Sequence, residues 1–393
     1  MNRTCAAALI AALWSGSAIA SLAAQSESQG KTVIRSPEEL TRYLAQAANT
    51  RSALDAMPVG ARKRFLAQLR FSAGGVGGFG TADLEDTLSH AQILEVMALF
   101  GLQQYGGQLQ GLATVRKPRD FESSFEVRFN AFNAALDLKS TLGSSGIEAS
   151  YRQLLGAGEP AELAKALDSY DRALLFRAML RVLREDTVSG QADQCRQVLA
   201  LLHGYGEETR NQVNQLFDIL VTLRQFDLAD QLAREYTGAG ISRLPERALV
   251  GDTKAVANST LLVSADGRRL SRGTLDLTHG LHIVVIAGCH FAKDAAIAIS
   301  AEPELNRLFE QHAVWLAPAS ERISDVAEWN RQLPSQPIQI AWRERDWPQI
   351  SSWNMPTFYV IRDGVLLKQW SGWTTDSGMA DLLEGLHGAG VTF

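Results

Sequence analysis

Cysteine is scarce in this sequence. Among its 393 residues there are only three cysteines, Cys5, Cys195 and Cys289. So few thiols exclude a small scaffold held together by several disulfides, and they exclude a zinc cluster built from cysteines. If the N-terminal segment that contains Cys5 is removed, as argued below, Cys195 and Cys289 remain. They leave two alternatives, one intramolecular disulfide or two free thiols.

The sequence also lacks long runs of residues with the same charge. The formal net charge is −5, and the Lys and Arg residues do not form a run that would follow a phosphate backbone. Nucleic acid is therefore not an expected partner. After residue 24 the sequence has no segment of about 20 apolar residues, so we expect no membrane span once the N-terminal segment is cleaved.

Motifs for cofactors and metals are not recognisable. The seven histidines do not have the spacing of metal ligands, and there is no P-loop and no nucleophile elbow. The stretch Gly75-Val-Gly-Gly-Phe-Gly80 fits a dinucleotide-binding pattern, but it follows a basic helical segment and not a strand. We predict a flexible loop between helices there. The sequence predicts neither a cofactor nor a bound metal.

The N-terminus resembles a secretory signal peptide. Arg3 precedes an apolar stretch from Ala6 to Trp14, and small residues follow that suit cleavage near residue 24. The apolar stretch is too short to favour a permanent membrane anchor. We therefore predict a signal peptide at residues 1–24, a disordered leader at 25–35, and a periplasmic or secreted protein in an oxidising compartment.

Two regions of different character follow the leader. Residues 36–240 contain helix signals joined by short connections, which predicts an all-helical domain of stacked hairpins. After a linker at 241–254, residues 255–393 alternate between strands and helices. In that region Asp363-Gly364 marks a β-hairpin. The predicted fold class is a multi-domain protein, with an all-α N-terminal domain of helical hairpins and a C-terminal α/β domain.

Cys289 lies where a buried strand passes into a helix. The stretch Ile283-Val-Val-Ile-Ala-Gly-Cys289 ends an apolar run in Gly288, and His290 follows the cysteine. A helix N-terminus favours negative charge, and a thiol placed there is typically more acidic. A charged His290 would favour the thiolate further. The pattern therefore predicts a reactive cysteine tuned by His290.

These residues resemble the thioredoxin-like superfamily, in particular its exported TlpA-type branch. IAGCHFAK stands where that family carries its strand–cysteine–helix junction, and Asn354-Met-Pro-Thr-Phe-Tyr-Val360 resembles its cis-proline loop. The resemblance covers about residues 255 to 388 and implies a thioredoxin-like C-terminal domain. It implies that Cys289 is the nucleophile and Pro356 the cis-proline. Met355 and Trp353, beside that proline, would line the substrate groove.

The sequence departs from this family at two positions. Ala292 stands where the second active-site cysteine is expected, and Gly288 replaces the usual tryptophan. Cys289 would form a mixed disulfide but would not close a local one. Cys195 is an alternative resolving thiol. It shares a helical face with Val198 and Leu199, however, which favours a buried core residue.

These observations leave two main hypotheses for function. The first is an exported thioredoxin-like protein with a single active-site cysteine, exchanging with protein thiols or disulfides of the cell envelope. The second is a redox-inactive binding or scaffold protein that uses its helical domain for protein interaction. In both, that domain would recruit a partner or form a dimer. A peroxidase with one catalytic cysteine is disfavoured because Ile286 occupies the threonine position of that motif.

Overall fold

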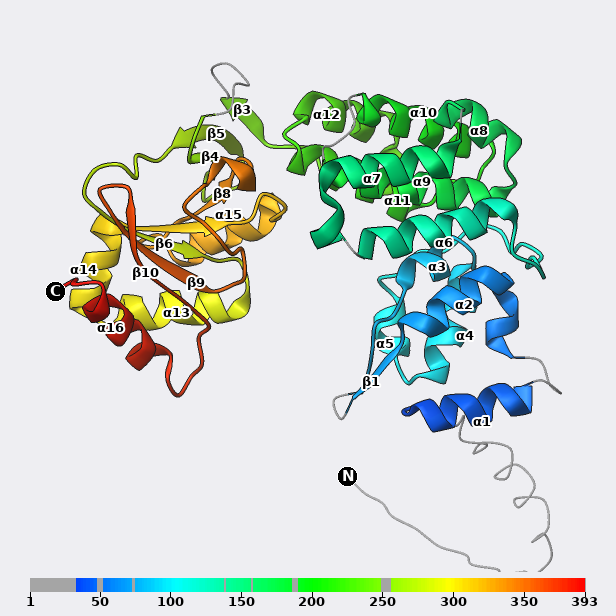
Figure 1. The fold of residues 1–393 in the computed structure, drawn as a ribbon, viewed down its shortest axis with the longest axis horizontal. Coiled ribbons are helices and arrows are strands. Elements are labelled where there is room, and N and C mark those ends of the chain that lie inside the picture. Colours follow the sequence, from blue (N-terminus) through cyan, green and yellow to red (C-terminus); the bar gives the residue numbers. More distant parts are fainter. Residues whose placement is uncertain are drawn as a thin grey trace, which may run out of the picture. The chain divides into compact units, whose positions relative to one another are not determined.

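The computed structural model describes residues 33–47, 52–72, 75–137, 139–156, 158–185, 190–248 and 256–392. The predicted signal peptide at 1–24, with Cys5, lies outside the described residues. The chain forms two compact units, Met1–Phe121 and Glu122–Phe393. Their elements are labelled in Figure 1.

The first unit is a small helical domain with one β-hairpin. Three aromatic rings, Phe65, Phe79 and Phe100, meet edge to face at centroid distances of 5.0 to 6.0 Å. Ser89 begins one helix with a capping box completed by Gln92. The elements are α1 (Pro37–Ala47), η1 (Ala53–Ala56), α2 (Val59–Gln68), β1 (Arg70–Ser72), β2 (Gly75–Gly77), α3 (Thr81–Glu85), α4 (His90–Leu99) and α5 (Gln103–Gly106).

Two predictions for this region are wrong. The glycine-rich stretch that we predicted as a loop contributes β2, which pairs antiparallel with β1 because Phe71 and Val76 pack against the unit's core. The end of the predicted disordered leader is also ordered. Ile34 is 1% exposed in the same core, and its N–H donates to the Leu99 carbonyl.

The second unit begins with seven helices that pack around a common apolar core. Asp168 caps the helix that begins at Ser169 by accepting from the N–H groups of Tyr170 and Asp171. The helices are α6 (Ser124–Asp137), α7 (Lys139–Leu155), α8 (Pro160–Ala166), α9 (Ser169–Arg184), α10 (Gln191–Gly204), α11 (Arg210–Thr222) and α12 (Phe226–Glu235). A 3-10 turn, η2 (Thr237–Ala239), follows them.

The rest of this unit is built on a mixed sheet of eight strands in the order β10-β9-β6-β7-β8-β4-β5-β3. The three central strands β6, β7 and β8 are parallel, whereas β9 is antiparallel to both β6 and β10. The strands are β3 (Glu246–Ala248), β4 (Ser259–Val263), β5 (Arg269–Thr274), β6 (Leu281–Ile286), β7 (Ala313–Ala317), β8 (Ile338–Ala341), β9 (Thr357–Arg362) and β10 (Val365–Ser371).

Alternate residues of the sheet pack into different apolar layers. Ile283 and Val285 of β6 belong to a core shared with the helices, while Val284 and Ile286 belong to a second cluster with Trp347 and Tyr359. The helices after β6 are α13 (His290–Ala301), α14 (Pro303–His312), α15 (Ile323–Gln332) and α16 (Gly378–Gly388), with a 3-10 turn η3 (Glu344–Asp346). Pro303, at the start of α14, separates it from α13.

The boundary between the compact units differs from the predicted one. The sequence placed a linker at 241–254, yet the structure groups α6–α12 with the sheet. The reason is the corner between α11 and α12. Arg224 donates to the carbonyls of Ala341 and Ala319, at 2.6 and 3.2 Å. The Phe226 ring is buried in the core of the sheet and lies 6.3 Å from that of Trp342.

Candidate functional site

Cys289 lies at the start of α13, directly after β6. It occupies the N-cap position with φ −90° and ψ 167°, and its carbonyl accepts the N–H of Lys293 at 3.1 Å. The side chain is half-buried and packs against the main core of the sheet. A free thiol therefore stands at a helix N-terminus, where backbone N–H groups favour a negative charge.

The Pro356 loop lies beside this cysteine. In the antiparallel pairing of β6 with β9, Ile286 is opposite Thr357, and the same register brings Gly288 level with Met355. The Met355–Pro356 peptide bond is cis. Met355 is 37% exposed, and its sulfur is 3.2 Å from the point that a Cβ on Gly288 would occupy. Met355 and Pro356 thus form one wall of the site.

A carboxyl group that sequence reasoning missed forms another wall. The Oε2 of Glu321 is 2.4 Å from the ideal Cβ position of Gly288. Gly288 has φ +146°, a conformation that side chains rarely adopt, so only glycine fits both the backbone and the space. The signal for Glu321 was its place just after β7, because neighbouring parallel strands end at the same edge of a sheet.

Burial raises the pKa of Glu321 above its ordinary value, and the charge of Asp325 raises it further. The backbone N–H of Arg322, which donates to Oε1 at 3.3 Å, acts in the opposite direction. The carboxyl beside the cysteine junction therefore holds its proton to a higher pH than a solvated glutamate does.

His290 and Trp353 occupy different surroundings. His290 is exposed at the first position of α13, and its ring lies 3.8 Å from the exposed ring of Phe291. Trp353 is half-buried and packs against the cluster that contains Trp347. Other tryptophans are core residues. The indole N–H of Trp315 donates to Gln336 at 2.8 Å, and that of Trp347 donates to the Ser259 carbonyl at 3.3 Å.

Neither position 292 nor Cys195 supplies a second thiol at the site. Ala292, at the position of the family's second cysteine, is fully buried in the core of the sheet. Cys195 is fully buried in the helical core, where burial raises the pKa of its thiol. Both Cys195 and Cys289 are free. The predicted helical face that Cys195 shares with Val198 and Leu199 is a buried face, as expected of a core thiol.

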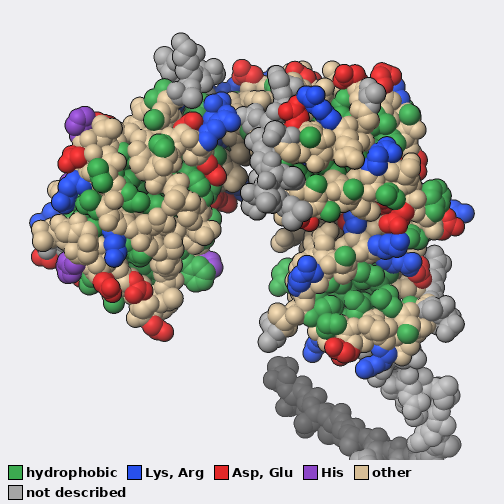
Figure 2. Space-filling view, viewed as in Figure 1, with side chains coloured by type: hydrophobic (Ala, Val, Ile, Leu, Met, Phe, Trp, Pro, Cys, Tyr) green, Lys and Arg blue, Asp and Glu red, His purple; other side chains and the backbone are tan. Residues whose placement is uncertain are grey.

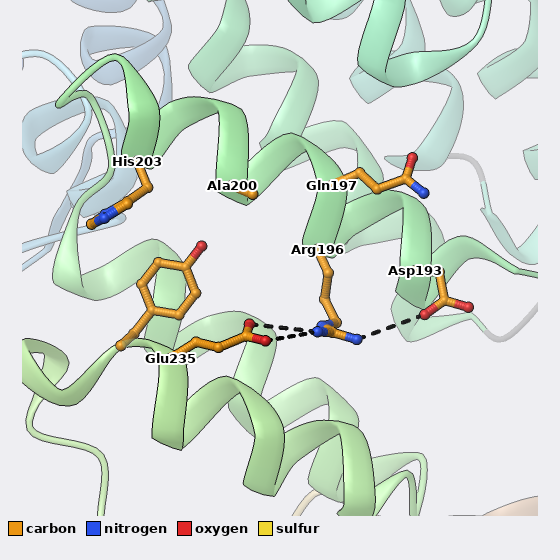
Figure 3. A pocket seen from close by; sticks show the side chains of 7 residues that line it. Asp193, Arg196, Gln197, Ala200, His203 and Glu235 are labelled. Atoms are coloured by element: carbon orange, nitrogen blue, oxygen red, sulfur yellow. Dashed lines mark hydrogen bonds and ion pairs between the residues drawn. The ribbon is translucent and has the colours of Figure 1, made fainter.

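The helical part carries a separate pocket of about 580 Å³ between α10 and the end of α12. Figure 3 shows Arg196 extending from α10 toward Glu235 and Asp193. It is bonded to Glu235 at 3.2 and 3.4 Å and paired with Asp193 at 3.9 Å. The rings of His203 and Tyr236 meet edge to face at 5.5 Å. The pocket thus combines carboxylates with aromatic walls.

The described residues contain neither a candidate metal site nor a candidate membrane-spanning helix. Within the described residues, no group of three or more His, Cys, Asp or Glu side chains is placed to hold a metal ion. Over the same parts of the chain, no helix has the length and apolar character that a bilayer crossing requires. On the face shown in Figure 2, acidic and basic side chains are interspersed.

Comparisons of the chain with protein-family models, with curated proteins and with solved structures give no significant match.

Proposed function

We propose that the protein is an exported, periplasmic thioredoxin-like protein in which Cys289 forms mixed disulfides with partner proteins. The observation that carries this proposal is the free thiol of Cys289 at the N-terminus of α13, beside the cis-proline loop. A half-buried free thiol at the start of a helix is accessible enough to react.

The arrangement around the cysteine supports a thioredoxin-like domain. A central strand, β6, leads through Cys289 into α13, and β7 returns parallel to β6. The loop with the cis bond at Pro356 enters β9, which forms an antiparallel hairpin with β10, and α16 follows. These are the features that the resemblance at Cys289 and Pro356 implies. The division into a helical domain and a thioredoxin-like domain is part of the same proposal.

The proposed chemistry needs only one thiol of this chain. The Cys289 thiolate attacks one sulfur of a partner disulfide, a new S–S bond forms, and the other sulfur leaves as a thiol after taking a proton. Because position 292 is alanine and Cys195 is buried in another core, neither position within the described residues resolves the mixed disulfide. A second thiol, from the partner or from a small thiol, must attack it. His290 and Phe291 would border the incoming partner.

The test is a comparison of the unmodified chain with Cys289→Ser. We expect the unmodified protein to form a mixed disulfide with a peptide disulfide at neutral pH, seen as a mass increase on the peptide containing Cys289. Cys289→Ser should give no adduct, while Cys195→Ala, a change in the buried thiol, should leave the adduct unchanged. Equal adduct yields for the unmodified protein and Cys289→Ser would refute the proposed function.

A second candidate function is favoured by the pocket between α10 and α12. Its walls carry Asp193 and Glu235, with Glu208 bonded to His203 at 2.9 Å, against one arginine, Arg196. Carboxylates beside aromatic rings suit a cationic side chain that has an aliphatic stem. The protein would then be a binding protein that takes a lysine or arginine side chain of a partner in its helical domain.

An NMR titration with argininamide tests this second candidate, with norvaline amide, which lacks the guanidinium group, as the control. We expect saturable shifts of the Ala200 and Tyr236 amide signals with argininamide alone, and loss of these shifts in Glu235→Gln. Shifts of equal size with norvaline amide, or no saturable shift with either compound, would contradict a cation-binding pocket. Neither result depends on the chemistry of Cys289.

A further inference from the structure

We propose that Glu321 is the acid–base residue of the Cys289 site, accepting the thiol proton as Cys289 attacks a disulfide and returning it to the leaving thiol. The inference rests on the proposed thiol–disulfide exchange and adds to it the residue that moves the proton.

The sheet register brings Glu321 to the cysteine. Strands β6 and β7 run parallel with Ile286 beside Leu316, and the N–H of Ala287 donates to the Leu316 carbonyl at 2.9 Å. The segments that follow β6 and β7 therefore leave the sheet at the same edge. The Glu321 carboxyl then lies over Gly288, the residue bonded to Cys289, with Oε2 2.4 Å from the ideal Cβ position.

The absence of a side chain at Gly288 makes this approach possible. The Met355 sulfur also lies near this point, at 3.2 Å from that Cβ position. Glu321 and Met355 thus fill the space that a larger residue at this position would need. Because Met355 carries no charge, Glu321 supplies the ionisable group of these two walls.

Two charged residues act on Glu321. Arg322 follows it in the loop, and Asp325 lies in the first turn of α15. Burial and Asp325 raise the pKa of Glu321, while Arg322 lowers it. The net increase brings the carboxyl closer to neutral pH, where an acid–base residue exchanges protons most effectively.

The loop that carries Glu321 is held in place. The N–H of Glu321 donates to the Pro318 carbonyl at 3.0 Å, and Arg224 of the helical part donates to the Ala319 carbonyl at 3.2 Å. After the loop, Ile323 starts α15. A carboxyl on a loop fixed in this way keeps its position during the reaction, which is what proton transfer requires.

The step balances in protons and electrons. The Glu321 carboxylate takes the proton of the Cys289 thiol, and the thiolate attacks one sulfur of the disulfide R–S–S–R′. The S–S bond to R′ breaks with its electron pair, and the bond between Cys289 and the R sulfur forms. The leaving R′–S⁻ takes the proton from Glu321. The sulfur of Cys289 is oxidised, and the R′ sulfur is reduced to a thiol.

Two disulfide probes separate proton transfer from a structural role. Attack on oxidised glutathione releases an alkyl thiolate, which takes up a proton at neutral pH. Attack on an aromatic dinitrobenzoate disulfide releases an aromatic thiolate, which is stable without a proton. We expect Glu321→Gln to slow the reaction of Cys289 with oxidised glutathione by about a hundredfold, and to slow the aromatic probe much less. The glutathione rate should also lose the part of its rise with pH that follows deprotonation of Glu321.

The controls are a charge-matched variant, a conservative variant and a blank. Asp294→Asn removes one negative charge from the exposed face of α13 and should leave the ratio of the two rates unchanged. Glu321→Asp should restore part of the glutathione rate. Cys289→Ser measures any reaction of the other thiols, which is subtracted.

The outcomes distinguish the two proposals. If Cys289 reacts with neither probe in the unmodified protein, the proposed function fails. If Cys289 reacts and Glu321→Gln slows both probes equally, or slows neither, the role of Glu321 is overturned while the thiol–disulfide function stands. Thermal unfolding of each variant shows whether a lost rate reflects a lost fold.

Discussion

At the residue scale, the backbone of Gly288 decides which side chains surround Cys289. Its φ of +146° turns the chain from β6 toward α13, and its missing side chain leaves room for Glu321 and Met355. A tryptophan at this position, as the resemblance would imply, has no space. The site therefore presents a carboxyl and a thioether beside the thiol.

We expect Gly288→Ala to destabilise the protein by about 3 kcal/mol, from backbone strain and from the contact with Glu321 and Met355. Gly280→Ala is the matched control, because Gly280 at the other end of β6 also has a positive φ, +79°, but has no atom within 4 Å of its Cβ position. It should cost about 1 kcal/mol. Urea unfolding measures both. Equal costs would show that the space above Gly288 is open.

The residues that sequence reasoning found and missed at this site differ in how they are encoded. Cys289 and Pro356 follow from local patterns, since a strand ending in glycine and a proline before a strand are each visible in a few residues. Glu321 is not marked by such a local motif, and its one signal is its place just after β7. Its position depends on the parallel pairing of β6 with β7 and on the course of the loop after Ala317.

At the element scale, the helical core holds two buried acids in their neutral forms. Cys195 on α10 is fully buried, and Tyr151 on α7 is 2% exposed. The Tyr151 hydroxyl accepts from the Gln191 side chain at 3.1 Å. Burial raises the pKa of both groups. In each case the folded state keeps a proton that the unfolded chain releases at lower pH.

This raised pKa of Cys195 predicts a loss of stability at alkaline pH. The stabilising effect is complete below the unfolded pKa of about 8.5 and is lost as the pH rises toward the folded pKa. From pH 9 to pH 10, Cys195 should lower the free energy of unfolding by about 1.4 kcal/mol. Cys195→Ala should lack this part of the slope. Urea unfolding at both pH values, monitored by circular dichroism, gives the comparison, and parallel slopes would contradict the prediction.

Arg224 joins the helical elements to the sheet. It has a left-handed backbone, φ 62°, and donates to the carbonyls of Val221, Ala319 and Ala341. Its guanidinium lies 5.8 Å from the centre of a Trp342 ring. Burial lowers the pKa of this arginine, and the charge of Arg343 lowers it further. The position of the Glu321 loop depends in part on this side chain.

We therefore expect Arg224→Met to lower the free energy of unfolding by about 3 kcal/mol, because three carbonyls lose a charged donor. Hydrogen exchange should accelerate in the loop at 318–322 and leave β6 protected. Arg210→Met, at the exposed start of α11, is the control and should cost less than about 0.5 kcal/mol. Unchanged exchange in this loop would show that Arg224 does not hold it.

The elements themselves were predicted unevenly. The hairpin at Asp363-Gly364 follows from its turn residues, and both have positive φ, 50° and 79°. Strand β5 has no comparable local signal. β5 has a single fully buried residue, Leu270, among polar ones, so no alternating pattern marks it. Its pairing with β4 determines the structure there.

At the scale of the whole molecule, each compact unit has its own apolar cores. The core of Met1–Phe121 is made of residues between Ile34 and Phe100, and the cores of Glu122–Phe393 are made of residues from Phe125 onward. The predicted boundary at 241–254 instead separates Phe226 from the sheet that buries it. Sequence composition changes there, but composition does not reveal that a helical corner completes the core of a sheet.

Two fragments distinguish these boundaries. We expect residues 122–393 to unfold in one cooperative urea transition and to keep the alkylation rate of Cys289 within about twofold of the full chain, because every contact of the site lies inside this fragment. Residues 241–393 lack Phe226 and Arg224, which leaves Trp342 uncovered and the carbonyls of Ala319 and Ala341 without their donor.

The shorter fragment should therefore be less stable by several kcal/mol, with the loss of burying Phe226 alone about 2 kcal/mol, and should expose apolar surface that binds a hydrophobic dye. Arg224→Met in the longer fragment gives an intermediate case, since it removes the hydrogen bonds and keeps Phe226. If residues 241–393 match residues 122–393 in stability and in Cys289 reactivity, the helical corner is not part of the folding unit that carries the site. In that case the predicted linker at 241–254 marks the start of the folding unit that carries Cys289.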